Sequence, residues 1–425
     1  MDSKKRQMMG GTRAASITTL LLTFSMLFLS PALYSAPKLF EPISLPAPIV
    51  IDPKAKAAAD AERKKRGGSD TSPIVEYKRE LPLEQITLPS GFEIEIYSDQ
   101  VPNARTLTVG DQGTLFVGTR TLGKVYALPD KDGDGKVDKV IEVGGRHFMP
   151  NGVTFHKGAL YVAENRRILR YNKIEENLEK QLKPETVYSR LPTERYQGWR
   201  YIRFGPDGQL YISIGAPCNI CSRSGFGQIV RLDLEKKRIK PFVTGVRNSG
   251  GFDWHPETGG FWFTDTARNW VEGEQPQDEL NYAPLAGLHF GFPYCFGKGM
   301  RDPEYGVNHH CGNYRSPVVE LGAHVSPLGM LFYTGKGFPS AYQERLYLVE
   351  NGSWDQQQKR GFKIWMATVK DGRKRNEEIF ASGWAGKKGE MPWGRLVDVA
   401  VAKDGALLVS DDLSGVIYRI SYNGK

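Results

Sequence analysis

The strongest constraint on the fold is a short pattern that this chain repeats six times. Each copy is a turn followed by a hydrophobic run, and the run is too short for a buried helix but suits a buried β-strand. Five copies carry glycine at their third position, where a tight hairpin needs the positive φ that glycine adopts easily. The copies are residues 111–118, 156–163, 206–213, 257–264, 342–349 and 403–410.

The spacing of the copies predicts the architecture. Their third residues are at positions 113, 158, 208, 259, 344 and 405, so the successive steps are 45, 50, 51, 85 and 61 residues. Three steps match one four-stranded blade of a β-propeller, and the two longer steps leave room for insertions. Because one blade cannot bury both of its faces, the six blades must close into a ring. We therefore expect an all-β, six-bladed β-propeller over residues 81–425.

The N-terminus has the pattern of a secretory signal. Four basic residues, the last of them Arg13, precede an apolar run at 17–29 that is short for a bilayer span. Residues 1–36 are thus predicted to be a signal peptide, cleaved after Ala32 or Ala36, and the protein to be periplasmic or secreted. Retention of this segment as an uncleaved membrane anchor is the open alternative.

Residues 37–80 are predicted to form a flexible linker or an exposed helix. The stretch is rich in Pro, Ala, Lys and Arg and has too few large apolar residues to pack into a core. Its basic residues and those of the signal segment account for much of the net charge of +9. The charge therefore indicates a solvated linker, and we expect no nucleic-acid partner.

The chain has four cysteines, which an oxidising compartment would pair. Cys218 and Cys221 form a C-x-x-C motif, while Cys295 and Cys311 lie in the longest gap between copies. The simplest pairing is Cys218 with Cys221 and Cys295 with Cys311. A four-thiolate zinc site is the alternative, although the second pair lacks the C-x-x-C spacing.

Several motifs follow one another between the third copy and the longest gap. They are Gly198-Trp-Arg, Thr244-Gly-Val-Arg-Asn, Phe263-Thr-Asp-Thr-Ala-Arg, Gln277-Asp-Glu-Leu-Asn and Gly291-Phe-Pro-Tyr-Cys. Over about residues 85–423 the chain resembles the glucose/sorbosone dehydrogenase family, the soluble six-bladed propellers that carry pyrroloquinoline quinone (PQQ). It is most similar to the sorbosone-dehydrogenase-like branch. The resemblance implies a quinoprotein oxidoreductase.

The resemblance also implies which residues bind the cofactor. Arg247 and Asn248 match the pair that faces the quinone oxygens, where a fixed charge and a neutral donor suit developing negative charge. Arg395 and Lys359 match the cations that bind the PQQ carboxylates. A second arginine is expected two residues after Arg395, but Val397 occupies that position. The structural alternative for Arg247 is a strand-end residue that caps a loop carbonyl.

Calcium and the general base follow from the same resemblance. The family binds Ca²⁺ through backbone carbonyls, at positions that match Ala267 and Arg268. Its catalytic histidine matches Gln197, which can orient a hydroxyl group but has no useful proton affinity near neutral pH. Tyr196, Glu194 or a water molecule could take its place, and none of the seven histidines occupies the family's base position.

A second candidate metal site is independent of the resemblance. The segment 130–138 has carboxylates at calcium-loop positions 1, 3, 5 and 9 and glycine at the sharp turn. Position 12 is Ile141, so the bidentate glutamate is missing. A weak calcium loop and a plain Asp-Gly turn are both open. The four carboxylates belong to Asp130, Asp132, Asp134 and Asp138.

These expectations combine into one functional hypothesis with two alternatives. The hypothesis is PQQ- and calcium-dependent oxidation of an aldose or sorbosone-like sugar, with catalytic roles for Gln197 and Arg247 and a respiratory quinone or cytochrome as electron acceptor. One alternative is a non-catalytic propeller that binds a sugar or protein in its channel. The other is a calcium-dependent lactonase, which would need side-chain carboxylates around a metal in the channel.

Overall fold

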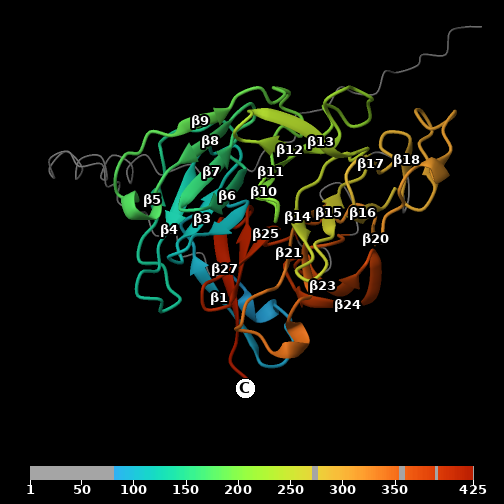
Figure 1. Cartoon of the computed structure of the whole chain (residues 1–425). Coiled ribbons are helices and arrows are strands. Elements are labelled where there is room, and N and C mark those ends of the chain that lie inside the picture. The colour runs from blue at the N-terminus through green and yellow to red at the C-terminus, as the bar shows by residue number, and fades with distance from the viewer. Residues whose placement is uncertain (1–80, 270–275, 354–358, 388–390, 425) are drawn as a thin grey trace, which may run out of the picture. The chain divides into compact units, whose positions relative to one another are not determined.

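A computed structural model describes residues 81–269, 276–353, 359–387 and 391–424. The predicted signal segment, 1–36, and the predicted linker, 37–80, lie outside the described residues. The described part is a six-bladed β-propeller, as predicted (Figure 1). Among the described residues, no helix has the length and apolar character needed to cross a membrane.

The first three blades follow one another along the chain, each as an antiparallel sheet. Blade 1 consists of β2 (Leu107–Val109), β3 (Leu115–Gly118), β4 (Val125–Leu128) and β5 (Ile141–Glu142). Blade 2 consists of β6 (Gly152–His156), β7 (Ala159–Ala163), β8 (Ile168–Tyr171) and β9 (Glu185–Tyr188). Blade 3 consists of β10 (Ile202–Phe204), β11 (Leu210–Ile214), β12 (Gln228–Asp233) and β13 (Arg238–Thr244), with β17 (Leu288–His289) added in parallel.

The other three blades carry the insertion and close the ring. Blade 4 consists of β14 (Phe252–Trp254), β15 (Phe261–Asp265), β16 (Asp278–Ala283) and β20 (Val319–Gly322). Blade 5 consists of β21 (Pro327–Phe332), β22 (Leu346–Glu350), β23 (Lys363–Lys370) and β24 (Arg373–Ser382). Blade 6 consists of β25 (Leu396–Val401), β26 (Leu407–Asp411), β27 (Val416–Tyr422) and β1 (Phe92–Ser98).

The six repeated segments supply the second strand of each blade: β3, β7, β11, β15, β22 and β26. The glycines of the five glycine-containing copies have φ values between 67° and 97°, as a tight hairpin requires. In the remaining copy Glu344 adopts φ 57°, so the backbone conformation is kept without the residue that favours it. The repeat therefore specifies one hairpin per blade.

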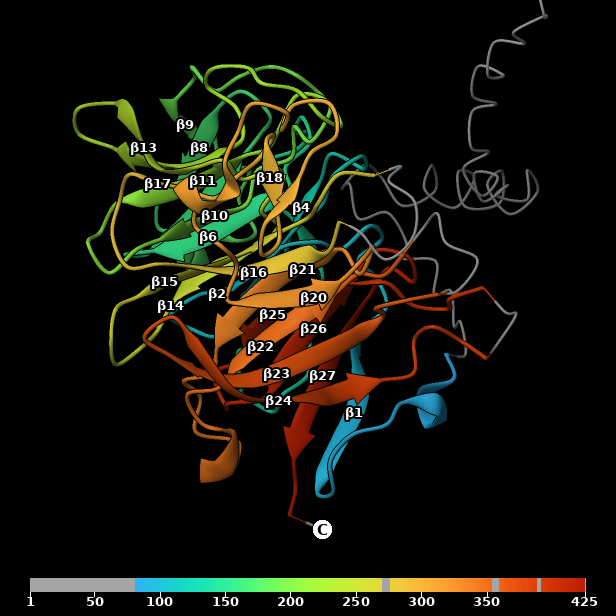
Figure 2. The ribbon, with the colours of Figure 1, turned by 90° about the vertical axis from the view of Figure 1, so that its right-hand side faces the viewer.

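The ring closes between the two ends of the described chain. Strand β1 pairs antiparallel with β27, with Phe92 opposite Tyr422, and becomes the outer strand of blade 6. Both views show β1 beside β27 (Figures 1 and 2). The sequence analysis did not predict this pairing, because β1 precedes the first repeated segment.

The hydrophobic core is divided among the six contacts between neighbouring blades. Each contact has its own cluster of buried residues, including one between blades 6 and 1 that contains Leu408 and Leu115. The contact between blades 3 and 4 is mostly aromatic, with the ring centroids of Tyr211 and Trp254 4.8 Å apart. Burial between blades therefore stabilises the ring as a whole.

The longest gap in the repeat is an insertion of blade 4, between β16 and β20. It contains β17, the hairpin of β18 (Cys295–Phe296) and β19 (Met300–Arg301), and the 3₁₀ turn η3 (Cys311–Asn313). The other 3₁₀ turns are η1 (Leu83–Gln85), η2 (Glu175–Asn177) and η4 (Ser340–Tyr342). The predicted disulfides Cys218–Cys221 and Cys295–Cys311 are both present, so no free cysteine remains for a zinc site.

Candidate functional site

The first strand of each blade begins, and the antiparallel second strand ends, at the same end of the ring. We call this end, formed by the loops that precede first strands and follow second strands, the mouth of the channel. The repeated hairpin turns lie at the opposite end. The mouth loops contain the predicted site residues Gln197, Arg247, Asn248, Ala267, Arg268, Lys359 and Arg395.

The side chain of Arg247 is buried and its position is fixed by hydrogen bonds. Its Nε donates to the carbonyl of Asn219 and its Nη2 to Oδ1 of the same residue, each over 2.9 Å. Its Nη1 donates to the carbonyl of Thr266 over 3.1 Å, and Nη2 also lies 3.3 Å from the hydroxyl oxygen of Tyr196. Burial lowers the pKa of Arg247. Carbonyl acceptors dominate, so the charge is held in place without a paired carboxylate on the guanidinium.

Asn219 was not singled out by the sequence analysis, although it lies within the C-x-x-C motif. Besides binding Arg247, its Oδ1 accepts the backbone N–H of Asn269 over 2.9 Å, and its Nδ2 donates to the carbonyl of Asn269 over 3.1 Å. Asn219 therefore joins Arg247 to the loop after β15. The Cys218–Cys221 disulfide flanks Asn219 on both sides.

Gln197 and Asn248 lie on either side of Gly215, which follows β11. A Cβ atom at Gly215 would lie 2.8 Å from both Oδ1 of Asn248 and Cβ of Gln197, so no larger residue fits there without displacement. Gln197 is 5% exposed, has φ 46°, and its Oε1 is buried without a hydrogen-bond partner among the described residues. A buried, unpartnered polar atom beside Asn248 is the kind of group that a ligand satisfies.

Two buried carboxylates accept backbone N–H groups, one from the predicted quinone residues and the other from the predicted calcium loop. Asp265 accepts the backbone N–H groups of Arg247 and Asn248 over 2.9 and 2.7 Å. Asp278 accepts the backbone N–H of Ala267 over 2.8 Å, and burial raises the pKa of Asp278 to about 7. The structure thus brings the two predicted quinone residues and the predicted calcium loop into one network.

The predicted calcium ligands are carbonyls of residues that are 7% exposed. Within the described ranges, no hydrogen bond reaches the carbonyl oxygen of Ala267 or Arg268. Backbone carbonyl oxygens are among the hard ligands that Ca²⁺ prefers. The Arg268 side chain points elsewhere, because its Nη1 donates to Asp302 of the insertion over 2.6 Å.

The other predicted cations lie in mouth loops of blades 5 and 6. Lys359 is half-buried in the loop between β22 and β23. Arg395 precedes β25, and its Nε donates to Oδ1 of Asp412 over 2.6 Å. Val397, at the position where the resemblance implies another arginine, is 2% exposed. The second carboxylate-binding arginine that the resemblance implies is therefore absent from β25 (Leu396–Val401).

Two arginines of blade 1 also lie at the mouth, and the sequence analysis missed them. Nη1 of Arg105 donates to Oδ2 of Asp412 over 2.6 Å, and its Nε donates to Oδ1 of Asn151 over 2.6 Å. The guanidinium of Arg120 lies over the ring of Trp199, 4.6 Å from its centroid. Arg105 and Asp412 are 307 positions apart in sequence, so no local motif could indicate their contact.

Of the proposed substitutes for the missing base, Tyr196 is the better placed. It is 42% exposed and its hydroxyl contacts Arg247. Glu194 instead forms an ion pair with Arg223, with Oε1 and Nη1 2.6 Å apart.

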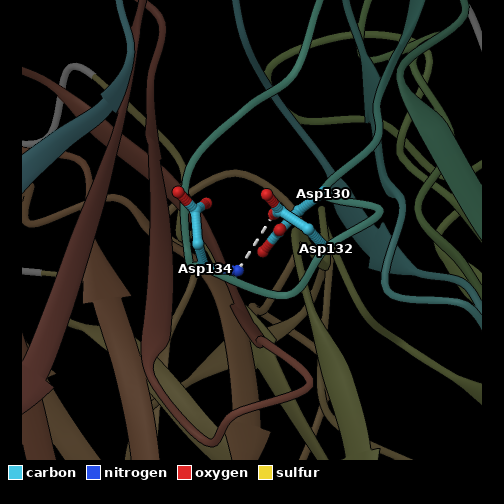
Figure 3. A group of neighbouring side chains, drawn as sticks. All are labelled: Asp130, Asp132 and Asp134. Carbon is cyan, nitrogen blue, oxygen red and sulfur yellow. Dashed lines mark hydrogen bonds between the residues drawn. The ribbon is translucent and has the colours of Figure 1, made fainter.

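The acidic loop 130–138 lies between β4 and β5, away from the mouth. Carboxylate oxygens of Asp130, Asp132 and Asp134 lie within 4.8 Å of one another, and the first two residues are drawn side by side in Figure 3. Asp130 also accepts the backbone N–H groups of Gly133 and Gly135, while Oδ2 of Asp138 accepts the backbone N–H of Lys131. The arrangement fits both the calcium loop and the plain turn.

A hollow lies toward the end of the ring opposite the mouth, because its lining reaches Gly205 and Pro206 of the hairpin turn between β10 and β11. It has a volume of about 450 Å³ and is lined by first strands of blades 1, 2, 3, 5 and 6. Its lining includes Thr108, Thr154 and Arg203. Arg203 forms an ion pair with Asp253, with Nη2 and Oδ1 3.3 Å apart, so this cation is already paired.

Comparison with known proteins agrees with the fold and the motifs. A family model described as TrAA12-like matches residues 86–423, which is most of the chain. An uncharacterized protein of Borreliella burgdorferi is 29% identical over 363 residues, covering 80% of this chain and 93% of that protein. The match of the family model confirms the family indicated by the sequence motifs.

Solved structures share the six-bladed ring at low sequence identity. The iodide structure of a Trichoderma reesei carbohydrate-active enzyme of family AA12 has a TM-score of 0.70 and 18% identity, covering 81% of this chain and 99% of that chain. A calcium structure from the same family and organism has a TM-score of 0.69, with 18% identity and coverage of 81% and 98%. The holo form of the PQQ domain of a Coprinopsis cinerea pyranose dehydrogenase has a TM-score of 0.65 and 17% identity, covering 79% and 97%.

Proposed function

The chain belongs to the TrAA12-like family, and from this premise we propose that it is a PQQ- and calcium-dependent dehydrogenase of an aldose or a sorbosone-like sugar. The observation that carries the proposal is the network at the mouth, where Asn219 and Asp265 fix Arg247 and Asn248. A related structure is a holo form of a pyranose dehydrogenase PQQ domain, and another is a calcium structure.

The residues at the mouth fit a polyanionic quinone. Bound PQQ would supply the quinone that accepts a hydride from the sugar. Arg247 and Asn248 would bind the quinone oxygens and stabilise negative charge there, since the protein holds both donors before any ligand arrives. Carbonyl oxygens of Ala267 and Arg268 would bind calcium, and Arg395 and Lys359 would bind carboxylates.

Gln197 determines how fast such an enzyme would be. Its amide can orient the sugar hydroxyl but cannot accept the proton, and a missing general base typically lowers the rate about 10²- to 10⁴-fold. Tyr196 contacts Arg247 and is the exposed group best placed to bind that hydroxyl as well. We propose a slow enzyme that is exported to the periplasm or secreted and passes electrons to a respiratory quinone or cytochrome.

The test is sugar-dependent dye reduction by purified protein supplied with PQQ and Ca²⁺, using a panel of aldoses. Gln197→His should raise the rate by about 10²-fold or more, because histidine restores a base and tolerates the positive φ of this position. Gln197→Leu serves as the matched control and should not raise it. Binding of PQQ without turnover in any of the three proteins would contradict the dehydrogenase proposal.

That outcome would favour the alternative of a non-catalytic propeller, which Gln197 supports. The lactonase alternative is less well supported. Within the described ranges, the one group of three closely spaced metal-binding side chains is Asp130, Asp132 and Asp134, and these lie outside the mouth.

A further inference from the structure

Three arginines meet at the mouth where blades 6 and 1 close the ring. Arg105 precedes β2, Arg120 follows β3 and Arg395 precedes β25. We call Arg105, Arg120 and Arg395 the closure arginines. Asp412 contacts two of them: its Oδ2 accepts Nη1 of Arg105 and its Oδ1 accepts Nε of Arg395, each over 2.6 Å.

The closure arginines carry more charge than the protein balances. Among the described residues, Asp412 is the one carboxylate within ion-pair distance of any of them, and none lies within that distance of Arg120. The neighbouring carboxyl of Asp411 is bound instead by the Tyr418 hydroxyl and the backbone N–H groups of Leu413 and Ser414. Burial, together with Arg105 and Arg395, lowers the pKa of Arg120 to about 10. Like charges held together at a partly buried site repel one another, and a bound anion would relieve that repulsion.

Trp199 connects the closure arginines to the quinone side of the mouth. Its ring lies under Arg120, and it stands two residues after Gln197 on the same loop. Its Nε1 is buried and has no hydrogen-bond partner among the described residues, as is also true of Oε1 of Gln197. The loop that holds Gln197 near Asn248 and Trp199 beside Arg120 thus carries two unpartnered polar atoms.

We propose that Arg105 and Arg120 act with Arg395 as the carboxylate-binding clamp for the cofactor. This inference rests on the proposed function and names residues of blade 1 that the sequence motifs do not assign. Val397 stands where the resemblance implies an arginine, and Arg105 and Arg120 of the neighbouring blade 1 provide the missing cation instead. Arg120, which has no carboxylate partner of its own in the described chain, is the principal binding group.

The melting temperature of the ligand-free protein distinguishes a binding role of Arg120 from a purely structural one. If Arg120 awaits an anion, the ligand-free protein suffers repulsion between Arg120 and the other two closure arginines. Removing its charge should leave the melting temperature of the ligand-free protein unchanged or raise it. If Arg120 suffers no such repulsion, the same change should lower that temperature, because the contact with Trp199 is lost and nothing offsets it.

The experiment is a titration of purified protein with PQQ in the presence of Ca²⁺, followed by quinone absorbance and by calorimetry. Arg120→Gln should weaken binding about 10- to 100-fold, the usual effect of one charged hydrogen bond. Arg238→Gln, an exposed change on β13, is the matched control and should bind as the wild type does. The trimethyl ester of PQQ, which lacks the carboxylate charges, should bind both variants equally.

Each outcome decides between the proposals. Failure of the wild type to bind PQQ would overturn the proposed function itself. Binding by the wild type with unchanged affinity in Arg120→Gln, or an equal loss of affinity for the trimethyl ester, would overturn the clamp alone. Because Arg105 is 5% exposed, its variants are at risk of misfolding, and Arg395→Gln is therefore the second variant. It should also bind PQQ more weakly than the wild type does, while its affinity for the trimethyl ester should stay unchanged.

Discussion

The two ends of the propeller ring are built on different principles. At the end opposite the mouth, hairpin turns repeat from blade to blade, with positive φ in all six copies. At the mouth the loops differ from one another, and buried groups such as Arg247 and Gln197 gather there with the half-buried Arg120. At the turn end, the same hairpin conformation pairs the backbone groups in each blade. At the mouth, some side-chain polar groups are left for a ligand to bind.

This difference predicts a separation of effects. Changes at the mouth should alter ligand binding, while changes at the turn end should alter stability and leave binding unchanged. A change at the turn end that weakens ligand binding, or a change at the mouth that leaves binding intact, would weaken the assignment of the mouth as the site.

The largest effect is expected from Arg247→Ala. The change removes the guanidinium that would bind the quinone and leaves the carbonyls of Asn219 and Thr266 without their donor. PQQ affinity should fall at least about 100-fold, and the free energy of unfolding by about 1–3 kcal/mol. Titration and urea unfolding measure the two effects. Retention of full affinity would show that Arg247 caps loop carbonyls and does nothing more.

A smaller effect is expected from Asn219, which positions Arg247 without facing the cofactor itself. Asn219→Ala removes the Oδ1 acceptor of Arg247 and Asn269, and should weaken PQQ binding about 10-fold. Asn219→Asp keeps the Oδ1 acceptor but loses the Nδ2 donor to the carbonyl of Asn269, so it should lose less affinity than Asn219→Ala. An equal loss in both variants, read by the same titration, would mean that Asn219 has no positioning role.

The acidic loop offers a test at the turn end. If Asp130, Asp132 and Asp134 bind Ca²⁺, millimolar calcium should stabilise the wild type by about 1 kcal/mol through ligand linkage. Asp132→Asn combined with Asp134→Asn should abolish that part of the thermal shift and leave PQQ binding unchanged. Calorimetric melting with calcium or with a chelator measures it. A wild type without any calcium-dependent shift would establish the plain turn.

The smallest effect concerns the copy without glycine. Glu344 has φ 57°, so Glu344→Gly should relieve backbone strain and stabilise the protein by about 0.5–1 kcal/mol. Gly158→Ala is the converse change: φ is 75° and a Cβ there meets nothing within 4 Å, so it should destabilise by about 1 kcal/mol through conformation alone. Urea unfolding should show that Glu344→Gly raises the free energy of unfolding and that Gly158→Ala lowers it. Equal signs would contradict the role assigned to the turn.

The sequence predicted the regular end of the molecule well, because each hairpin is specified by adjacent residues. The six hydrophobic runs, five of them after a turn glycine, indicated all six second strands, and the cysteine spacing indicated both disulfides. The pairing of β1 with β27 was not predicted, because it joins segments more than 300 residues apart that share no local pattern.

The mouth was predicted in part. Motifs singled out Gln197, Arg247 and Asn248, which lie at one end of the ring, but the contacts that support them join different loops. Asn219 is 28 residues from Arg247 in sequence, and its place between two cysteines was the one signal that could have identified it. Arg105 and Arg120 gave no signal, since only ring closure brings them to Arg395.

Hydrogen–deuterium exchange with and without PQQ and Ca²⁺ tests the central claim most directly, because it locates the ligand on the ring. We expect slower exchange in the mouth loops around residues 195–200, 216–222 and 264–269, and unchanged exchange in the hairpin turns around 342–345 and 403–406. No protection at the mouth, or equal protection at both ends, would contradict the account.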